Sequence, residues 1–202
     1  MIKKYALPIA VILLVLIIDQ TVKLYIKSHY PIGEVARLFG NWSRITFTEN
    51  PGMAFGIEFG GNYGKLALSV FRILAVFFGF YYIKKIVTEK EHKGFIVCVS
   101  LVLAGAIGNI LDSAFYGLLF SASTEYDIAA FMPPEGGYAG FLHGQVVDML
   151  YFPLFDGTFP SWFPVWGGER FEFFNAIFNV ADMAISFGIG IILVFQKWFF
   201  KS

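Results

Sequence analysis

The stretch Phe173–Phe195 reads FFNAIFNVADMAISFGIGIILVF, and it places one acid, Asp182, in an otherwise apolar run. A run of ~20 apolar residues is long enough to cross a bilayer. A carboxylate inside such a run costs roughly 2.5–3.5 kcal/mol on insertion scales, so it indicates a functional site with a partner elsewhere in the chain. The partner that we infer is Asp148. Paired carboxylates without surrounding metal ligands are typical of aspartic-protease chemistry.

The composition is that of an integral membrane protein. Of the 202 residues, 57% are hydrophobic and only 15% are charged, whereas a soluble domain has roughly 25% charged residues. The formal net charge is zero, so no nucleic-acid partner is predicted. The single cysteine, Cys98, lies in an apolar run and is expected to be a small core residue. With no cysteine pair and three scattered histidines, neither zinc nor another cofactor is expected.

Four apolar segments predict transmembrane helices at approximately 5–26, 66–83, 94–116 and 173–196. Lysines precede the first segment, fill the loop 84–93 and follow the last segment, so both termini are predicted to be cytoplasmic. The first segment begins like a signal peptide, but no small-residue cleavage site follows it, and we expect it to be retained. The prediction is an all-α polytopic membrane protein with one membrane domain over 1–202.

The two regions expected outside the membrane, 27–65 and 117–172, differ in character from the helices. Ser43–Thr48 alternates β-branched and aromatic residues and predicts a strand, which the turn at Asn50-Pro51-Gly52 ends. Met53–Gly56 is expected to return as a second strand, giving a small β-containing region at the membrane surface. Phe152–Trp166 is rich in proline and aromatic residues, and it is expected to lie on the membrane interface.

Polar side chains of all four predicted helices gather toward the outer side of the membrane. They are Asp19 and Lys23 in the first helix, Arg72 in the second, Asn109 and Asp112 in the third, and Asn179 and Asp182 in the fourth, with Asp148 in the second outer region. Asp19 is four residues from Lys23 on one helix face, and Asp112 is expected to pair with Arg72. Asp148 and Asp182 then remain without a counter-ion, and two adjacent buried carboxylates share one proton.

Each of these residues also has a purely structural interpretation. Asp19 and Lys23 form a plausible structural ion pair at a helix end, and Asn109 is suited to an interhelical hydrogen bond. Arg72 is long enough to reach the outer interface, and Asp148 by itself reads as an ordinary loop aspartate. Asp182 is the hardest to explain in structural terms, because the prediction places it well inside its helix.

Five blocks in this order resemble the lipoprotein signal peptidases, the bacterial signal peptidase II family. They are Asp19-Gln20-Thr21-Val22-Lys23, Asn50-Pro51-Gly52-Met53-Ala54-Phe55-Gly56, Gly105-Ala106-Ile107-Gly108-Asn109-Ile110-Leu111-Asp112, Val146-Val147-Asp148 and Phe178-Asn179-Val180-Ala181-Asp182. Each block alone is weak, but five in order on a four-helix topology are specific, and they span nearly the whole chain.

The resemblance implies a metal-independent intramembrane aspartyl endopeptidase that removes the signal peptide from diacylglyceryl-modified prolipoproteins, cutting before the lipidated cysteine. By block, Asp148 and Asp182 would be its catalytic residues. Family positions that support the site or contact substrate fall on Asp19, Lys23, Asn50, Gly108, Asn109, Asp112, Asn179 and Ala181. The resemblance also implies inhibition by globomycin and a multi-pass location in the bacterial cytoplasmic (inner) membrane, with the site on the extracytoplasmic side. Membrane lipid is an expected partner, and we expect a monomer.

The chain departs from the family pattern in three places. Ser113 stands where the family usually has arginine, and we expect Arg72 or Arg170 to supply that cation. Met149 stands where phenylalanine is common. The outer stretches 117–143 and 153–170 are longer than in a typical member.

Two other classes of function remain open on the residues alone. A proton- or ion-coupled transporter also needs intramembrane carboxylates, but the polar layer stays on one side and no inverted repeat is present. A structural or assembly subunit would explain the topology but not two acids without counter-ions. Asparagine substitution of each acid separates these classes, because a scaffold should tolerate the change.

Overall fold

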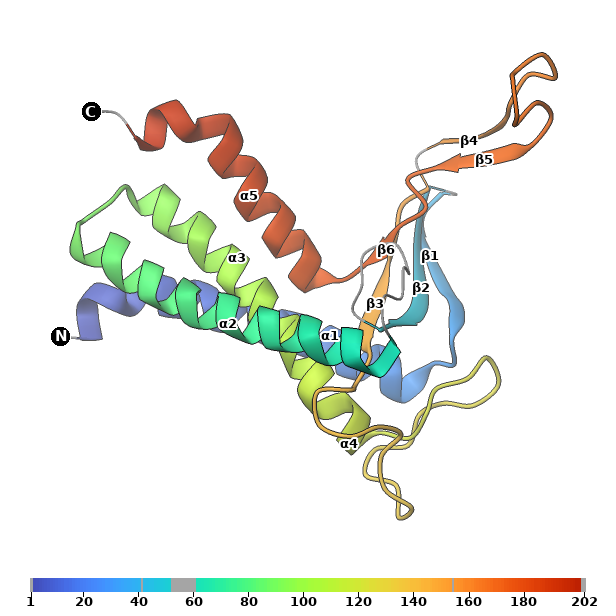
Figure 1. Ribbon diagram of the computed structural model, residues 1–202, viewed down its shortest axis with the longest axis horizontal. Helices are drawn as coiled ribbons and strands as arrows, with labels where there is room; N and C mark the ends of the chain where they lie inside the picture. The colour runs from blue at the N-terminus through green and yellow to red at the C-terminus, as the bar shows by residue number, and fades with distance from the viewer. Residues whose placement is uncertain (1, 41, 52–60, 154, 201–202) are drawn as a thin grey trace.

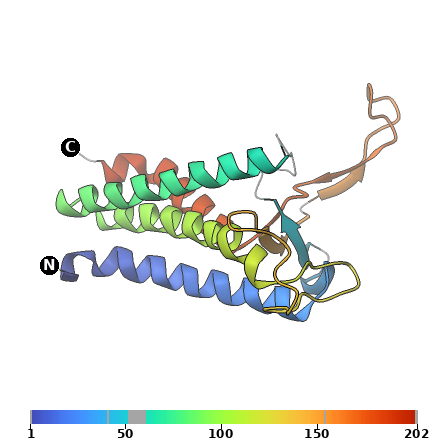
Figure 2. The same cartoon turned by 60° about the horizontal axis from the view of Figure 1, so that its bottom comes forward.

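The computed structural model describes residues 2–40, 42–51, 61–153 and 155–200. Long helices form a bundle with a β region at one end, and both chain termini lie at the other end (Figure 1, Figure 2). The long helices are α1 (Ala6–His29), α2 (Gly61–Thr88), α3 (Lys93–Leu111) and α5 (Val180–Phe199), and a 3-10 turn (Ile2–Tyr5) precedes α1. Among the described residues, four helical segments are long and apolar enough to cross a membrane, which indicates a multi-pass membrane protein.

The first three helices lie where the sequence predicts them, and α1 and α2 extend beyond the predicted segments. Helix α1 continues to His29, and α2 extends from Gly61 to Thr88. Helix α3 passes into one π-helical turn, Asp112–Tyr116, and then into the short helix α4 (Gly117–Leu119). Single π turns inside helices are frequent at functional sites. Here the turn begins at a predicted site residue, Asp112.

The prediction for the fourth helix, 173–196, is wrong at its start. Helix α5 begins at Val180, and the residues before it form strand β6 (Ile177–Phe178). Asn179 is the N-cap: its side chain accepts the backbone N–H of Asp182 at 2.9 Å, while Oδ2 of Asp182 accepts the N–H of Asn179 at 3.3 Å. This reciprocal capping box satisfies N–H groups that a helix start leaves free. Asp182 therefore lies in the first turn of its helix, not deep inside it.

The β region is more extensive than the sequence indicates. An antiparallel sheet of four strands runs in the order β1-β2-β3-β6, with β1 at Gly33–Phe39, β2 at Ser43–Asn50 and β3 at Val146–Tyr151. The predicted strand at 43–48 is confirmed as part of β2. The predicted return strand, Met53–Gly56, lies outside the described residues. Asp148, which the prediction placed in a loop, is in β3, where it pairs with Thr48 of β2.

A second, two-stranded sheet forms a hairpin of β4 (Phe155–Thr158) and β5 (Arg170–Phe173). The hairpin projects from the sheet end of the molecule, away from the bundle (Figure 1, Figure 2). Its tip is aromatic and exposed: the ring of Phe159 contacts Phe163, Trp166 and Phe171, and Trp162 is 78% exposed. Contact of this segment with the membrane interface stays a prediction.

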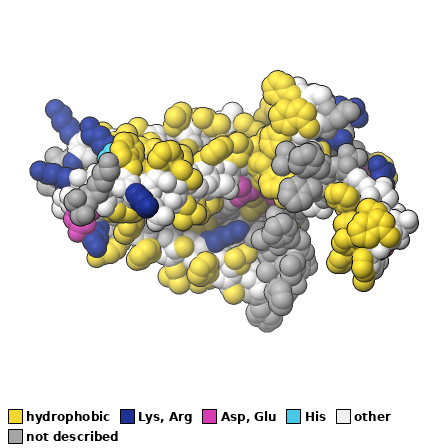
Figure 3. All heavy atoms as spheres, turned by 90° about the horizontal axis from the view of Figure 1, so that it is seen from above, with side chains coloured by type: hydrophobic (Ala, Val, Ile, Leu, Met, Phe, Trp, Pro, Cys, Tyr) yellow, Lys and Arg dark blue, Asp and Glu magenta, His cyan; other side chains and the backbone are white. Residues whose placement is uncertain are grey.

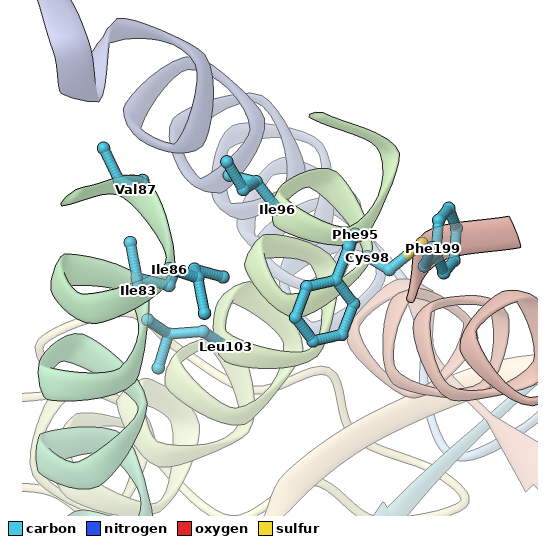
Figure 4. Close-up of a cluster of buried hydrophobic side chains, with 8 residues drawn as sticks. All are labelled: Ile83, Ile86, Val87, Phe95, Ile96, Cys98, Leu103 and Phe199. Carbon is cyan, nitrogen blue, oxygen red and sulfur yellow. The ribbon is translucent and has the colours of Figure 1, made fainter. Parts of the chain in front are cut away.

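The terminal end of the bundle is closed by a hydrophobic cluster from three helices (Figure 4). Its buried members are Ile83, Ile86 and Val87 of α2, Phe95, Ile96, Cys98 and Leu103 of α3, and Phe199 of α5. Cys98 is thus a small core residue, as predicted. Nearer the sheet end of the bundle, a Cβ on Gly105 would clash with the carbonyl oxygen of Ala181. The small residues of α3 therefore allow α5 to approach closely, as the sequence indicated.

Candidate active site

A buried ion triad lies where the sheet meets the helices. Lys23 of α1 contacts Asp19 at 2.9 Å and Asp112 at 2.8 Å, and all three side chains are 0% exposed. The expected Asp19–Lys23 pair is therefore present. Asp112 was expected to pair with Arg72; the structure gives it an ion pair with Lys23 and an electrostatic interaction with Arg72. One ammonium group therefore forms ion pairs with two carboxylates. Spacing along the chain could not predict the second of these pairs.

Each acid of the triad also holds the backbone next to a candidate catalytic aspartate. Oδ1 of Asp19 accepts the N–H of Ala181 at 2.9 Å, immediately before Asp182. Oδ2 of Asp112 accepts the N–H of Val147 at 3.3 Å, immediately before Asp148. The triad thus fixes the start of α5 and the middle of β3 relative to α1 and α3.

Two asparagines connect the triad to both candidate aspartates. Asn109 accepts a hydrogen bond from Lys23 at 2.9 Å and donates one to Oδ1 of Asp182 at 2.8 Å. Nδ2 of Asn179 donates to Oδ1 of Asn109 at 3.1 Å and to Oδ1 of Asp148 at 2.6 Å. A continuous path of side-chain hydrogen bonds therefore runs from Asp148 through the two amides to Asp182.

Asp148 is buried, and its second oxygen accepts a hydrogen bond from Nδ2 of Asn50 at 3.1 Å. Burial raises the pKa of Asp148 to about 7, and the negative charge of Asp182 adds to this shift. The bonds from Asn50 and Asn179 and the charge of Lys23 act in the opposite direction. At neutral pH this site can therefore hold a proton that an ordinary aspartate would have lost.

The electrostatic surroundings of the two candidate aspartates include Arg72. Within the described ranges, no Lys or Arg forms an ion pair with Asp148 or Asp182. Arg72 of α2 interacts electrostatically with Asp182, Asp148 and Asp112, in decreasing order. Arg170 lies in β5 of the projecting hairpin. The electrostatic interactions of Arg72 with these carboxylates are consistent with its expected role as a replacement for the missing family arginine, which stays a prediction.

Ser113, at the position of that arginine, is buried in the π turn, and its hydroxyl donates to the carbonyl of Asn109 at 3.1 Å. Gly108 has a separate geometric role, because a Cβ there would come within 2.7 Å of Oδ2 of Asp19. A side chain at this position would therefore displace the triad.

The sequence interpretation gave no role to Gln20 or Tyr116. Nε2 of Gln20 donates to Asp112 at 2.8 Å and to Asp19 at 3.1 Å, and its Oε1 accepts from the hydroxyl of Tyr116 at 3.1 Å. Gln20 thus gives both acids of the triad a further hydrogen-bond donor. The position of Gln20 between Asp19 and Lys23 in the first block was the sequence feature that could have indicated this role.

Every predicted site residue lies in or against this network, and the roles assigned to them stay predictions. They are Asp19, Lys23, Asn50, Arg72, Gly108, Asn109, Asp112, Asp148, Asn179, Ala181 and Asp182. Acidic side chains are visible in a recess flanked by hydrophobic side chains (Figure 3). Paired carboxylates in such surroundings can act as a general acid and a general base.

Comparison with known proteins agrees with the sequence blocks. The family model for signal peptidase (SPase) II matches residues 11–199. The lipoprotein signal peptidase of Porphyromonas gingivalis is 50% identical over 186 residues, covering 92% of this chain and 80% of that protein. The lipoprotein signal peptidase of Amoebophilus asiaticus is 36% identical over 188 residues, covering 92% of this chain and 75% of that protein.

Solved structures share the fold. A bacterial membrane enzyme determined by the in meso method at 2.3 Å resolution superimposes with a TM-score of 0.59 at 22% identity, covering 96% of this chain and 91% of that one. A second such structure, at 1.9 Å resolution, gives a TM-score of 0.58 at 21% identity, covering 93% and 90%. With a family model that matches almost the entire chain and relatives of this similarity, the protein belongs to the signal peptidase II family of proteases.

Proposed function

We propose that this protein is an intramembrane aspartyl endopeptidase that removes the signal peptide from diacylglyceryl-modified prolipoproteins. It cuts before the lipidated cysteine, and Asp148 and Asp182 activate the attacking water. The observation that carries the proposal is the hydrogen-bonded path Asp148–Asn179–Asn109–Asp182, which joins two carboxylates while Lys23 serves the other two acids. The similarity to lipoprotein signal peptidases supports the substrate class.

The division of charge supports different roles for the four acids. Asp19 and Asp112 both contact the ammonium group of Lys23 and accept backbone N–H bonds, so they are suited to a structural role. Asp148 and Asp182 receive amide hydrogen bonds but form no ion pair with a Lys or Arg of the described chain. Two carboxylates in this situation share one proton, which is the working state of an aspartic protease.

The chemistry follows from that shared proton. The ionised carboxylate takes a proton from water as the water oxygen bonds to the scissile carbonyl carbon, and the protonated carboxyl group gives its proton to the carbonyl oxygen. In the second step a proton passes to the amide nitrogen and the C–N bond breaks. The signal peptide leaves with a new carboxylate, and the lipidated cysteine keeps the free amine.

The asparagines hold the two aspartates at a fixed separation during these steps. Asn179 bonds Asp148 through its side chain and Asp182 through its backbone N–H, so a single residue orients both. Asn109 bonds Asp182 and is itself oriented by Lys23. Because these donors are fixed by the buried triad, they need no rearrangement as charge moves between the carboxylates.

The surroundings fit a lipid-modified substrate. The recess with acidic side chains is flanked by hydrophobic side chains, and the helices are clad in exposed apolar residues that membrane lipid would cover (Figure 3). We propose that the signal peptide enters laterally between helices while its acyl chains stay in the bilayer. Lysines at the terminal end favour cytoplasmic termini, which puts the site on the extracytoplasmic side of the bacterial inner membrane. The same proposal includes a monomeric enzyme and inhibition by globomycin, which would occupy the site.

The direct test is cleavage of a diacylglyceryl-modified prolipoprotein peptide by the purified protein and by Asp148→Asn and Asp182→Asn. Asp127→Asn is the matched control, because Asp127 is exposed in the outer loop and the substitution is identical. We expect cleavage by the parent and the control, with globomycin inhibiting both. We expect no cleavage by either variant of the Asp148/Asp182 dyad, and neither variant should melt below the parent. Full activity in either variant would reject the dyad. A parent protein that never cuts would return the transporter hypothesis.

A further inference from the structure

A second buried charge cluster lies outside the network described above. It consists of Lys27 in α1, Glu49 in β2, and Ser123, Phe120 and Tyr138 of the outer region that follows α4, and we refer to it as the Lys27 cluster. Lys27 is 0% exposed and forms an ion pair with Glu49. Its ammonium also donates to Oγ of Ser123 at 2.9 Å, and Ser123 donates to Glu49 at 2.8 Å.

Aromatic rings complete the surroundings of this ammonium. Nζ of Lys27 lies 5.2 Å from the ring centre of Phe120 and 5.1 Å from that of Tyr138. Cations at this distance are attracted to the ring face, more strongly when water is excluded. Both rings contact the buried hydrophobic cluster that includes Phe47 and Val147 of the sheet. The Lys27 cluster therefore joins α1, β2 and the long outer region at a single buried point.

Nothing in the proposed reaction uses these charges. Neither Lys27 nor Glu49 bonds Asp148 or Asp182, and Lys23 already serves the triad. A buried ion pair is in general weak evidence for stability, because hydrophobic residues of similar size often stabilise as well. Its use in fixing one specific arrangement of chain segments is better supported.

The register of the sheet shows which side chains of β2 the Lys27–Glu49 pair holds in place. Glu49 pairs with Val147 across β2 and β3, while Thr48 pairs with Asp148. Successive residues of a strand point to opposite faces. Glu49 is thus held on the face toward α1, and the next residue, Asn50, reaches Asp148 with its amide at 3.1 Å. Displacement of Glu49 from Lys27 would move the backbone that places this amide.

We propose that the Lys27 cluster positions Asn50 against Asp148, so that Glu49 and Lys27 are positioning residues for the cleavage reaction. The inference rests on the proposed function, because it takes Asp148 as catalytic. The long outer region 117–143 contributes Ser123, Phe120 and Tyr138 to this cluster, which gives the region a structural role in the proposed positioning. Lys27 is four residues beyond Lys23, so one face of α1 carries both the triad and this cluster.

The test uses the full-length protein with Glu49→Gln and Lys27→Met, and with Lys27→Arg as the conservative rescue. Glu89→Gln and Lys93→Met are matched controls at exposed positions near the terminal end. With a diacylglyceryl-modified prolipoprotein peptide, we expect Glu49→Gln and Lys27→Met to lower kcat by about 10- to 100-fold, as for a slightly misplaced catalytic contact. KM should change less than twofold, and Lys27→Arg should restore most of kcat.

A double-mutant cycle distinguishes positioning from general structure. Asn50→Ala removes the amide through which Glu49 is proposed to act, so Glu49→Gln should have almost no further effect in that background. Equal losses of kcat in the parent and the Asn50→Ala background would overturn the inference. Should Glu49→Gln fail to fold, Ser123→Ala removes two hydrogen bonds of the same cluster, leaves the Lys27–Glu49 ion pair in place, and enters the same cycle.

The pH profile gives an independent readout. The amide of Asn50 favours the ionised form of Asp148, so losing it raises the pKa of Asp148 and moves the alkaline limb of kcat/KM to higher pH. The other groups that face Asp148 are Asp182 on α5, Lys23 on α1 and Arg72 on α2, and the substitutions leave them in place. An unshifted limb with reduced kcat would contradict positioning. Inactive dyad variants beside a fully active Glu49→Gln would leave the proposed function standing and reject this inference alone.

Discussion

The backbone N–H of Ala181 donates a 2.9 Å hydrogen bond to Oδ1 of Asp19, a residue 162 positions earlier in the chain. The acceptor is itself in an ion pair with Lys23, and the donor precedes Asp182. The first helix therefore sets the position of the residue that we assign to catalysis on the last helix. We therefore predict that Asp19 affects activity through this contact, without a hydrogen bond to Asp148 or Asp182.

Asp19→Ala should lower both stability and activity. It leaves the buried N–H of Ala181 without its acceptor, which costs about 1–3 kcal/mol, and it leaves Lys23 with one carboxylate instead of two. We expect a lower melting temperature in detergent and a fall in kcat of at least tenfold, with KM little changed. Asp127→Ala is the control at an exposed position. An Asp19→Ala enzyme with the kcat of the parent would show that the contact does not position Asp182.

Lys23→Met should be among the most destabilising single substitutions. It leaves Asp19 and Asp112 buried together without a cation, and breaking a buried pair in this way costs about 3–5 kcal/mol. Thermal unfolding measures the effect, with Lys84→Met at the exposed end of α2 as control. Adding Asp112→Asn to Lys23→Met should recover part of the loss, because one uncompensated charge is removed. No recovery in the double variant would argue against charge as the cause.

Substitutions of Asn179 should separate helix capping from orientation of the dyad. Asn179→Ala removes the N-cap of α5, which costs about 0.5–2 kcal/mol, and also removes the donor to Asp148. Asn179→Ser keeps a capping oxygen but has no amide to reach Asp148. We expect Asn179→Ser to melt near the parent temperature while its kcat is as low as that of Asn179→Ala. Equal kcat for Asn179→Ser and the parent would remove Asn179 from the catalytic arrangement.

The pH dependence of kcat/KM should be bell-shaped, with its alkaline limb set by Asp148. Its pKa is raised to about 7 by burial and by the charge of Asp182. Because the reaction needs one shared proton, activity should fall as pH rises through about 7 and that proton is lost. Steady-state cleavage across pH 5–9 in one mixed buffer measures this. A profile that is flat through this range would contradict a shared proton.

Asp148→Asn should stabilise the protein at alkaline pH. A group whose folded pKa is raised opposes folding once the unfolded chain loses its proton, so stability falls as pH rises toward about 7. The neutral amide removes this cost and the repulsion from Asp182. We expect a higher melting temperature than the parent at pH 8 and a clearly smaller difference at pH 5, where the folded Asp148 keeps its proton and the unfolded chain has already lost it. Equal differences at both pH values would exclude ionisation as the origin.

The sequence predicted most of the fold and the membership of the site. Apolar runs longer than a bilayer gave the four spans, and the β-branched run Ser43–Thr48 gave most of β2. The start of the fourth helix was missed because Phe173–Phe178 is apolar, and hydropathy alone cannot distinguish strands from the first turns of a helix. The capping residue Asn179 was the local signal that marked the true boundary.

What the sequence by itself determined are the properties that depend on residues near one another in the chain: the spans, most of strand β2 and the residue types that acid–base chemistry needs. Only the tertiary structure decided the pairings. Lys23 serves Asp112 as well as Asp19, Asn179 joins Asp148 to Asn109, and Lys27 meets Glu49, each across a long separation in sequence. These contacts depend on how closely α3 and α5 pack and on which face of β2 turns toward α1. Packing of this kind is a property of the whole chain, so spacing along it could name the charged residues but not their partners.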